Sequence, residues 1–170
     1  MALAEFIRDL PHAADAAGQA VYAGPGYLGP HGQNFSSRLG PIVIDTEKII
    51  TAPRGLFGFE ALRQFVLLRL PAERFGPLGL LQCIEDTSSA FLFYADVPAA
   101  SLYRPGDLEA ACRDLAIDLH AAATLVLVAA RPSPAGLTMN LRAPVIVDTA
   151  HRVVFQHILV NGDYPVRFKP

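Results

Sequence analysis

Two short β-branched runs near the C-terminal end restrict the possible folds more than any other stretch of the chain. The first run is Val145–Val147 and the second is Val153–Phe155, and both lie within the segment from Leu137 to Leu159. Asp148-Thr149-Ala150 lies between them and is short enough to turn one strand back on the other. The segment therefore predicts an antiparallel hairpin.

Similar short apolar runs, bounded by proline, glycine or acidic and hydroxyl clusters, occur along most of the preceding chain. They are Ile42–Asp45, Lys48–Thr51, Gln64–Arg69, Leu78–Ile84, Ala90–Tyr94 and Thr124–Ala130. One helix is expected at about Asp107–Leu115, because Pro105-Gly106-Asp107 supplies an N-cap and Asp107 and Glu109 favour the helix N-terminus. Because strands and helices do not alternate, we predict a mainly β fold, a small antiparallel β-barrel or sandwich with one short α-helix.

The first 37 residues differ in composition from the rest of the chain. Leu3, Phe6, Ile7 and Leu10 have helical spacing, Pro11 ends that pattern, and the segment from Gly24 to Gly32 is rich in glycine and proline. We therefore divide the chain into an N-terminal extension, residues 1–37, and a compact domain, residues 38–170. Since the apolar stripe would otherwise be exposed, residues 2–10 are expected to dock on that domain.

Charge and cysteine content exclude several classes of protein. The net charge is −2 and the chain has only two lysines, Lys48 and Lys169, so no basic stripe favours direct nucleic-acid binding. Cys83 and Cys112 are far apart in apolar runs, which predicts buried free thiols. The N-terminal residues lack the uninterrupted apolar region of a signal peptide, and no apolar run approaches the roughly 20 residues of a membrane span, so we expect a cytoplasmic protein with no membrane partner.

The motifs of common enzymes and metal sites are missing. The histidines form no His-x-x-x-His pair, and the cysteines lack ligand spacing. Gly24-x-Gly26-x-x-Gly29 matches the dinucleotide-binding pattern, but no strand precedes it and prolines flank it. We therefore expect no metal, no cofactor and no enzymatic activity.

Two further sets of residues have both a structural and a functional interpretation. Gln82, Asn140 and Gln156 are amides within apolar runs, so they either bridge strands or recognise a partner. In Gly55-Leu56-Phe57-Gly58-Phe59-Glu60, the two glycines either suit a tight loop that places Phe57 or Phe59 in a core, which is the interpretation we prefer, or contact a ligand.

Four motifs, in order and across more than three quarters of the chain, resemble those of the FliW flagellar assembly factors. They are Gly55-Leu56-Phe57-Gly58-Phe59-Glu60, Leu81-Gln82-Cys83-Ile84-Glu85-Asp86, Asn140-Leu141-Arg142-Ala143-Pro144, and Gln156-His157-Ile158-Leu159 with Tyr164-Pro165-Val166-Arg167 downstream. The chain departs from the family pattern at Cys83, where serine is usual, and at Asp148, where asparagine is common. The residues before Arg38 have no counterpart in the family pattern.

The resemblance implies an antiparallel β-barrel that binds the translational regulator CsrA and also flagellin, and so couples flagellin synthesis to assembly. The implied mechanism is sequestration without chemistry, by a protein that is a monomer apart from its partners. The proposed partner contacts are Glu85, Asp86, Asn140, Arg142 and Gln156. Two alternatives stay open: a chaperone of flagellin alone, and a barrel that binds a small molecule or uses His151 or His157 as a base.

Overall fold

The computed structural model describes residues 32–37, 40–70, 75–94, 99–130 and 136–169. The predicted helical stripe of residues 2–10 lies outside these ranges. The strands are β1 (Gly32–Ser37), β2 (Gly40–Asp45), β3 (Ile50–Thr51), β4 (Gln64–Arg69), β5 (Leu78–Cys83), β6 (Ala90–Tyr94), β7 (Ala122–Ala130), β8 (Leu137–Met139), β9 (Val145–Asp148) and β10 (Val153–Gln156). The helices are α3 (Ala99–Leu102) and α4 (Pro105–Asp114), with 3-10 turns at Thr46–Lys48 and Leu119–Ala121.

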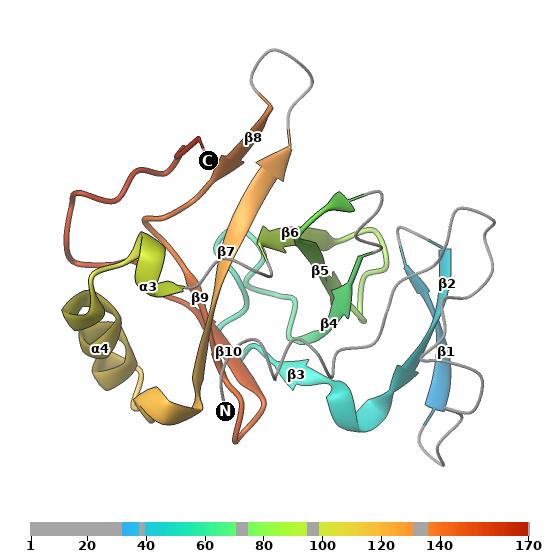
Figure 1. Ribbon diagram of the computed structural model, residues 1–170. Coiled ribbons are helices and arrows are strands. Elements are labelled where there is room, and N and C mark those ends of the chain that lie inside the picture. The colour runs from blue at the N-terminus through green and yellow to red at the C-terminus, as the bar shows by residue number, and fades with distance from the viewer. Residues whose placement is uncertain (1–31, 38–39, 71–74, 95–98, 131–135, 170) are drawn as a thin grey trace.

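The strands from β3 onward form a closed barrel, as Figure 1 shows. Their order is β6-β5-β4-β3-β10-β9-β7-β8, and pairing of β6 with β7 closes a ring that leaves β8 outside it. All pairings are antiparallel except that of β3 with β10, where Thr51 pairs with Val153. The predicted mainly β fold is confirmed.

The hairpin predicted from Val145 to Phe155 is β9 and β10, with Val154 opposite Val147 and Phe155 opposite Ile146. Its turn is fixed by Asp148, whose carboxylate accepts hydrogen bonds from the amides of Ala150 and His151 and lies 2.8 Å from Nδ1 of His151. Burial on its own would raise the pKa of Asp148, but these hydrogen bonds outweigh it and hold the pKa below its usual value. An ionised Asp148 therefore stabilises the reversal.

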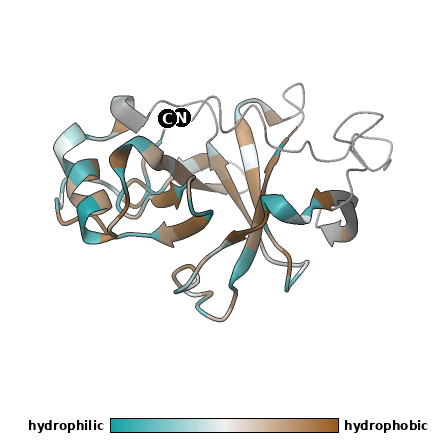
Figure 2. Ribbon diagram, turned by 90° about the horizontal axis from the view of Figure 1, so that it is seen from below, coloured by the Kyte–Doolittle hydropathy of each residue, from teal (hydrophilic) through white to brown (hydrophobic). Residues whose placement is uncertain are grey.

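Side chains alternate between two cores because successive strand residues point to opposite faces. Phe65 and Leu67 of β4 contribute to a cluster inside the barrel, and Val66 and Leu68 to a second cluster that includes Tyr103, Ala111 and Cys112 from the helical region. The barrel strands are accordingly mostly apolar in Figure 2, whereas α4 alternates between polar and apolar residues. Helix α4 thus covers one outer face of the barrel, and the predicted burial of both free thiols, Cys83 and Cys112, is confirmed.

The predicted start of the helix is wrong by two residues. Helix α4 begins at Pro105, and its N-cap is Arg104, whose side chain makes no capping hydrogen bond. Proline has no amide hydrogen to satisfy and its fixed φ suits the first helical position, so the helix starts there without an Asx cap. Asp107 lies in the first turn instead and is free to bond elsewhere.

Strands β1 and β2 form a separate two-stranded sheet, with Phe35 opposite Ile42. This pairing crosses the boundary that the sequence suggested between residues 37 and 38. The division into an extension and a barrel domain stays a prediction.

Candidate functional site

The loop from Gly55 to Glu60 holds two phenyl rings toward solvent. Gly55 and Gly58 have φ of 66° and 82°, which glycine adopts without strain. Leu56 is 1% exposed, whereas Phe57 and Phe59 are 51% and 41% exposed. The prediction that one of these phenylalanines enters a core is wrong, because Leu56 takes that position and the left-handed glycines turn both rings outward.

Hydrogen bonds make this loop rigid. The amide of Phe57 donates to Oε1 of Gln156 at 3.0 Å, and the amide of Gly58 donates to Oε1 of Glu60 at 2.8 Å. The amide of Phe59 donates to the carbonyl of Leu56 at 2.8 Å. The hydrogen bond from Gly58 also lowers the pKa of Glu60, so this carboxylate is charged at neutral pH. The exposed rings are therefore preorganised and lose little freedom on binding.

A groove of about 350 Å³ lies next to this loop. The link is Phe91 in β6, whose ring contacts that of Phe59 edge to face at a centroid distance of 4.8 Å and also lines the groove. We call this feature the β6–β7 groove; its lining residues are Phe91, Leu127, Val128, Ala129, Thr138, Asn140, Val166 and Arg167. Strands β6 and β7 pair only as far as Leu92 and Val128. The two strands diverge beyond this pair, and the barrel wall opens there. Arg167 is the charged side chain of this lining.

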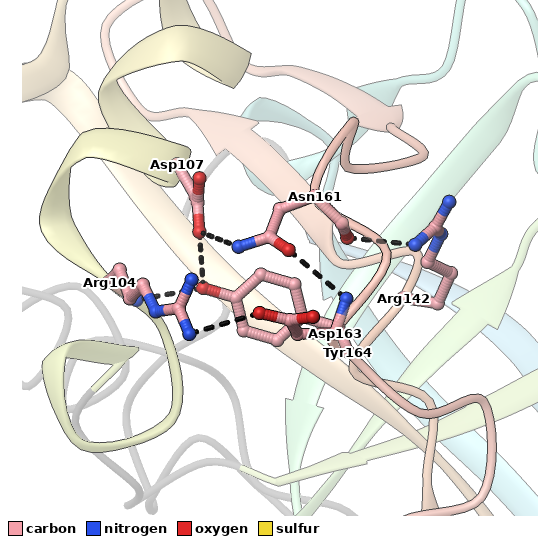
Figure 3. Close-up of polar contacts among 6 residues, drawn as sticks. All are labelled: Arg104, Asp107, Arg142, Asn161, Asp163 and Tyr164. Carbon is pink, nitrogen blue, oxygen red and sulfur yellow. Dashed lines mark hydrogen bonds and ion pairs between the residues drawn. The ribbon is translucent and has the colours of Figure 1, made fainter.

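The C-terminal segment, which supplies Val166 and Arg167, is fastened to α4 by the polar network in Figure 3. Tyr164 donates its hydroxyl hydrogen to Oδ2 of Asp107 at 2.7 Å and accepts a hydrogen bond from the amide of Arg104 at 2.9 Å. Asn161 donates its side-chain amide to the same Asp107 oxygen at 3.0 Å. Hydrogen bonds from Tyr164 and Asn161 lower the pKa of Asp107, so the network holds a carboxylate.

Further contacts hold this segment in place, among them a hydrogen bond of 3.0 Å from the amide of Leu141 to the carbonyl of Pro165. Arg104 forms an ion pair with Asp163 at 3.0 Å, and Arg142 donates from Nη1 to the carbonyl of Asn161 at 2.8 Å. Farther along, Met139 and Phe168 exchange backbone hydrogen bonds of 2.8 and 2.9 Å. The segment thus forms a fixed wall of the groove.

Replacing Tyr164 with phenylalanine tests the network. The change removes both hydroxyl hydrogen bonds, and we expect a loss of about 1 kcal/mol in the free energy of unfolding, because solvent reaches the pair and weakens it. Since Asp107 has a lowered pKa when folded, its contribution is present above the usual carboxyl pKa and is lost as pH falls through the folded pKa. Urea unfolding at pH 7 and at about pH 3 should therefore show a difference between wild type and Tyr164→Phe that shrinks at acid pH.

Tyr94→Phe is the matched control, because the Tyr94 hydroxyl has no hydrogen bond to a described residue. It should leave stability nearly unchanged at both pH values. If the difference in the free energy of unfolding between wild type and Tyr164→Phe stays constant or grows at acid pH, the role given to Asp107 is contradicted.

The five residues predicted as partner contacts all make hydrogen bonds within the chain, and they fall into two places. Glu85 accepts from the amides of Arg63 and Gln64 at 2.5 and 3.0 Å, and Asp86 accepts from Ser88 and Ser89 side chains at 2.7 and 2.5 Å. These hydrogen bonds lower the pKa of both carboxyls. Both side chains therefore order the loop after β5 while keeping their negative charge.

The other three predicted residues converge on the segment before β9. Oδ1 of Asn140 accepts from the amides of Arg142 and Ala143 at 3.1 and 3.2 Å, and Gln156 donates to the carbonyl of Ala143 at 3.3 Å. Only Asn140 also lines the groove, whereas Gln156 supports the aromatic loop. Partner contact by any of the five stays a prediction.

Sequence reasoning missed the exposed rings and most of the groove lining. The available signal was the pair of glycines in the Gly55–Glu60 loop. Glycines can adopt positive φ, and the loop can then direct the neighbouring side chains either into the core or toward solvent. The end of the β6–β7 pairing depends on contacts distant in sequence, and no local pattern marks it.

The histidines considered as bases lie elsewhere. His151 is the exposed partner of Asp148, with 78% of its side chain accessible, and Nε2 of His157 lies 3.8 Å from Asp114. Neither lines the groove. Within the described ranges no three His, Cys, Asp or Glu side chains cluster as metal ligands, and no helix there has the length and apolarity to cross a membrane.

The fold and this surface define a small β-barrel protein that presents rigid aromatic side chains beside an apolar groove. A family model described as "FliW protein" matches residues 34–170, and the chain belongs to that FliW family. A "Flagellar assembly factor FliW" from Desulfovibrio desulfuricans is 38% identical over 129 residues, which are 72% of this chain and 75% of the relative. The protein of the same name from Thermotoga maritima is 32% identical over 135 residues, 78% of this chain and 89% of the relative.

The fold agrees with a solved structure. A crystal structure titled as the flagellar assembly factor FliW matches with a TM-score of 0.65 and 23% identity, over 81% of this chain and 99% of that one. At this identity the match supports the fold of the barrel.

Proposed function

We propose that this chain is a flagellar assembly factor that acts by binding, sequestering a CsrA-type translational regulator and also binding flagellin. The observation that carries the proposal is the pair of phenyl rings, Phe57 and Phe59, held outward by hydrogen bonds next to the β6–β7 groove. Membership of the FliW family and the names of the relatives support it. Sequestration requires no catalytic group, and the sequence carries none of the common enzyme motifs considered above.

An exposed aromatic side chain on a rigid loop is suited to protein recognition. A few aromatic anchors supply most of the binding free energy in protein interfaces, and anchors already held in place lose less conformational entropy. In this proposal Phe59 and Asn140 contact the partner directly, and Gln156 positions the loop through the amide of Phe57.

The acidic groups affect how a partner arrives. Glu60, Glu85 and Asp86 all have lowered pKa values and are negative at neutral pH. A basic regulator of translation would be attracted by these charges, which raises association rates more than affinity. Glu85 and Asp86 are therefore proposed as contacts at the edge of the interface. Arg142 is proposed to support the C-terminal segment, which supplies Val166 to the groove.

Calorimetry with purified partners tests the function. The host's CsrA-type regulator and its flagellin are each titrated into the full chain, and each is expected to bind with a dissociation constant near or below about 1 μM. Binding of flagellin alone would favour a dedicated flagellin chaperone and contradict sequestration of the regulator. No binding of either protein would overturn the proposal.

A further inference from the structure

The aromatic loop and the groove leave an apolar surface with one charged side chain in the groove lining. Phe59 and Val166 are 41% and 60% exposed, and Phe91 connects the loop to the groove. Arg167 has no ion pair with any described residue, so the lining offers apolar contact beside a cation. We propose that residues 2–10 of this same chain occupy the β6–β7 groove when no partner is bound.

The sequence of residues 2–10 matches this surface both in its apolar residues and in its charge. Leu3, Phe6, Ile7 and Leu10 lie within about 100° of one another on an ideal helix, which gives a narrow apolar stripe. Glu5 and Asp9 are four residues apart and lie on the flank next to Phe6, whereas Arg8 lies on the opposite side. Docking of the stripe would place the acidic flank against Arg167.

The connection between this segment and the domain is long enough. Residues 11–31 separate the stripe from β1 along the sequence, and the root-mean-square end-to-end distance of a random coil with this number of residues is about 25 Å. The radius of gyration of a domain of this size is about 14 Å, so most of its surface lies within reach. Tethering gives an effective concentration on the order of 1 mM, so an intrinsically weak contact is sufficient for substantial occupancy.

The docked segment would compete with partners for the groove, a consequence that rests on the proposed function. If the groove is free about a quarter of the time, partner affinity falls about fourfold relative to a chain whose segment cannot dock. The family match begins at residue 34, so this control would be particular to chains that carry such an extension.

A single tryptophan can report the docking, because the chain contains none. In the full-length protein without partner, Phe6→Trp places the indole on the apolar stripe, and Ala4→Trp places it outside the stripe, about 110° from its middle on an ideal helix, as the matched control. We expect acrylamide to quench Phe6→Trp about threefold less than Ala4→Trp, with a blue-shifted emission. Equal quenching would overturn the proposal.

Second substitutions locate the contact. Adding Val166→Asp to Phe6→Trp should raise quenching to the level of Ala4→Trp, whereas adding Val160→Asp, at an 87% exposed position outside the groove lining, should not. Protection that survives Val166→Asp, or that disappears on dilution, would overturn docking in the groove of the same chain. These measurements need no partner, so they stand or fail independently of the calorimetry.

Discussion

Phe59→Ser is expected to weaken binding of the CsrA-type regulator by at least about 30-fold, equivalent to about 2 kcal/mol. The side chain is part of a preorganised aromatic pair, and serine removes the ring while leaving the loop hydrogen bonds between backbone and side chains in place. Calorimetric titration with the full chain gives the affinity directly.

Ile158→Ser is the control for this change. Ile158 is an apolar residue with 53% exposure that lies outside the aromatic loop and the groove lining. It should alter affinity less than about threefold, within the range of peripheral interface positions. Equal losses for the two variants would mean that the Gly55–Glu60 loop is not the anchor.

Gly55→Ala should lower the free energy of unfolding by about 3 kcal/mol or more, combining a left-handed backbone conformation with overpacking. A Cβ at Gly55 would lie 2.6 Å from Cα of Glu60 and 2.6 Å from the carbonyl oxygen of Phe59, and both atoms belong to the backbone. Backbone atoms move only when the loop is rearranged, so binding should fall together with stability.

Gly58→Ala separates the cost of the left-handed backbone conformation from the cost of overpacking. Gly58 has a φ of 82°, but a Cβ there meets nothing within 4 Å. Only the conformational cost of about 1–2 kcal/mol remains. Denaturant unfolding of both variants should therefore rank Gly55→Ala as clearly the more destabilised, and equal effects would contradict the packing described for this loop.

The sequence predicted the architecture well because its signals are local. The hairpin from Val145 to Phe155 follows from two short, mostly β-branched apolar runs on either side of a short turn, and the structure confirms it. The start of α4 was predicted two residues too late, because both Pro105 and Asp107 are residues at which a helix commonly begins. Which of them begins the helix depended on whether the Asp107 carboxylate caps the helix or bonds to another side chain. That partner is Tyr164, 57 residues later, which no local pattern reveals.

The candidate site was less accessible from sequence. Asn140 and Gln156 drew attention as amides in apolar runs, and the structure gives both a defined hydrogen-bonding role near the surface. The outward direction of Phe57 and Phe59 was predicted wrongly, because hydrophobicity alone favours burial and only the two positive φ values reverse it. The groove arises where β6 and β7 stop pairing, which is a property of the closed barrel.

Amide hydrogen exchange of the full chain, alone and saturated with the CsrA-type regulator, would locate the binding surface on the barrel. If the aromatic loop and the β6–β7 groove form the binding surface, added protection should concentrate in residues 55–60, 137–141 and 164–168. The exposed residues 157–160 should change little. Protection confined to 157–160, or to the hairpin turn at 149–152, with no change at 55–60, would contradict binding of the regulator at the aromatic loop and the β6–β7 groove.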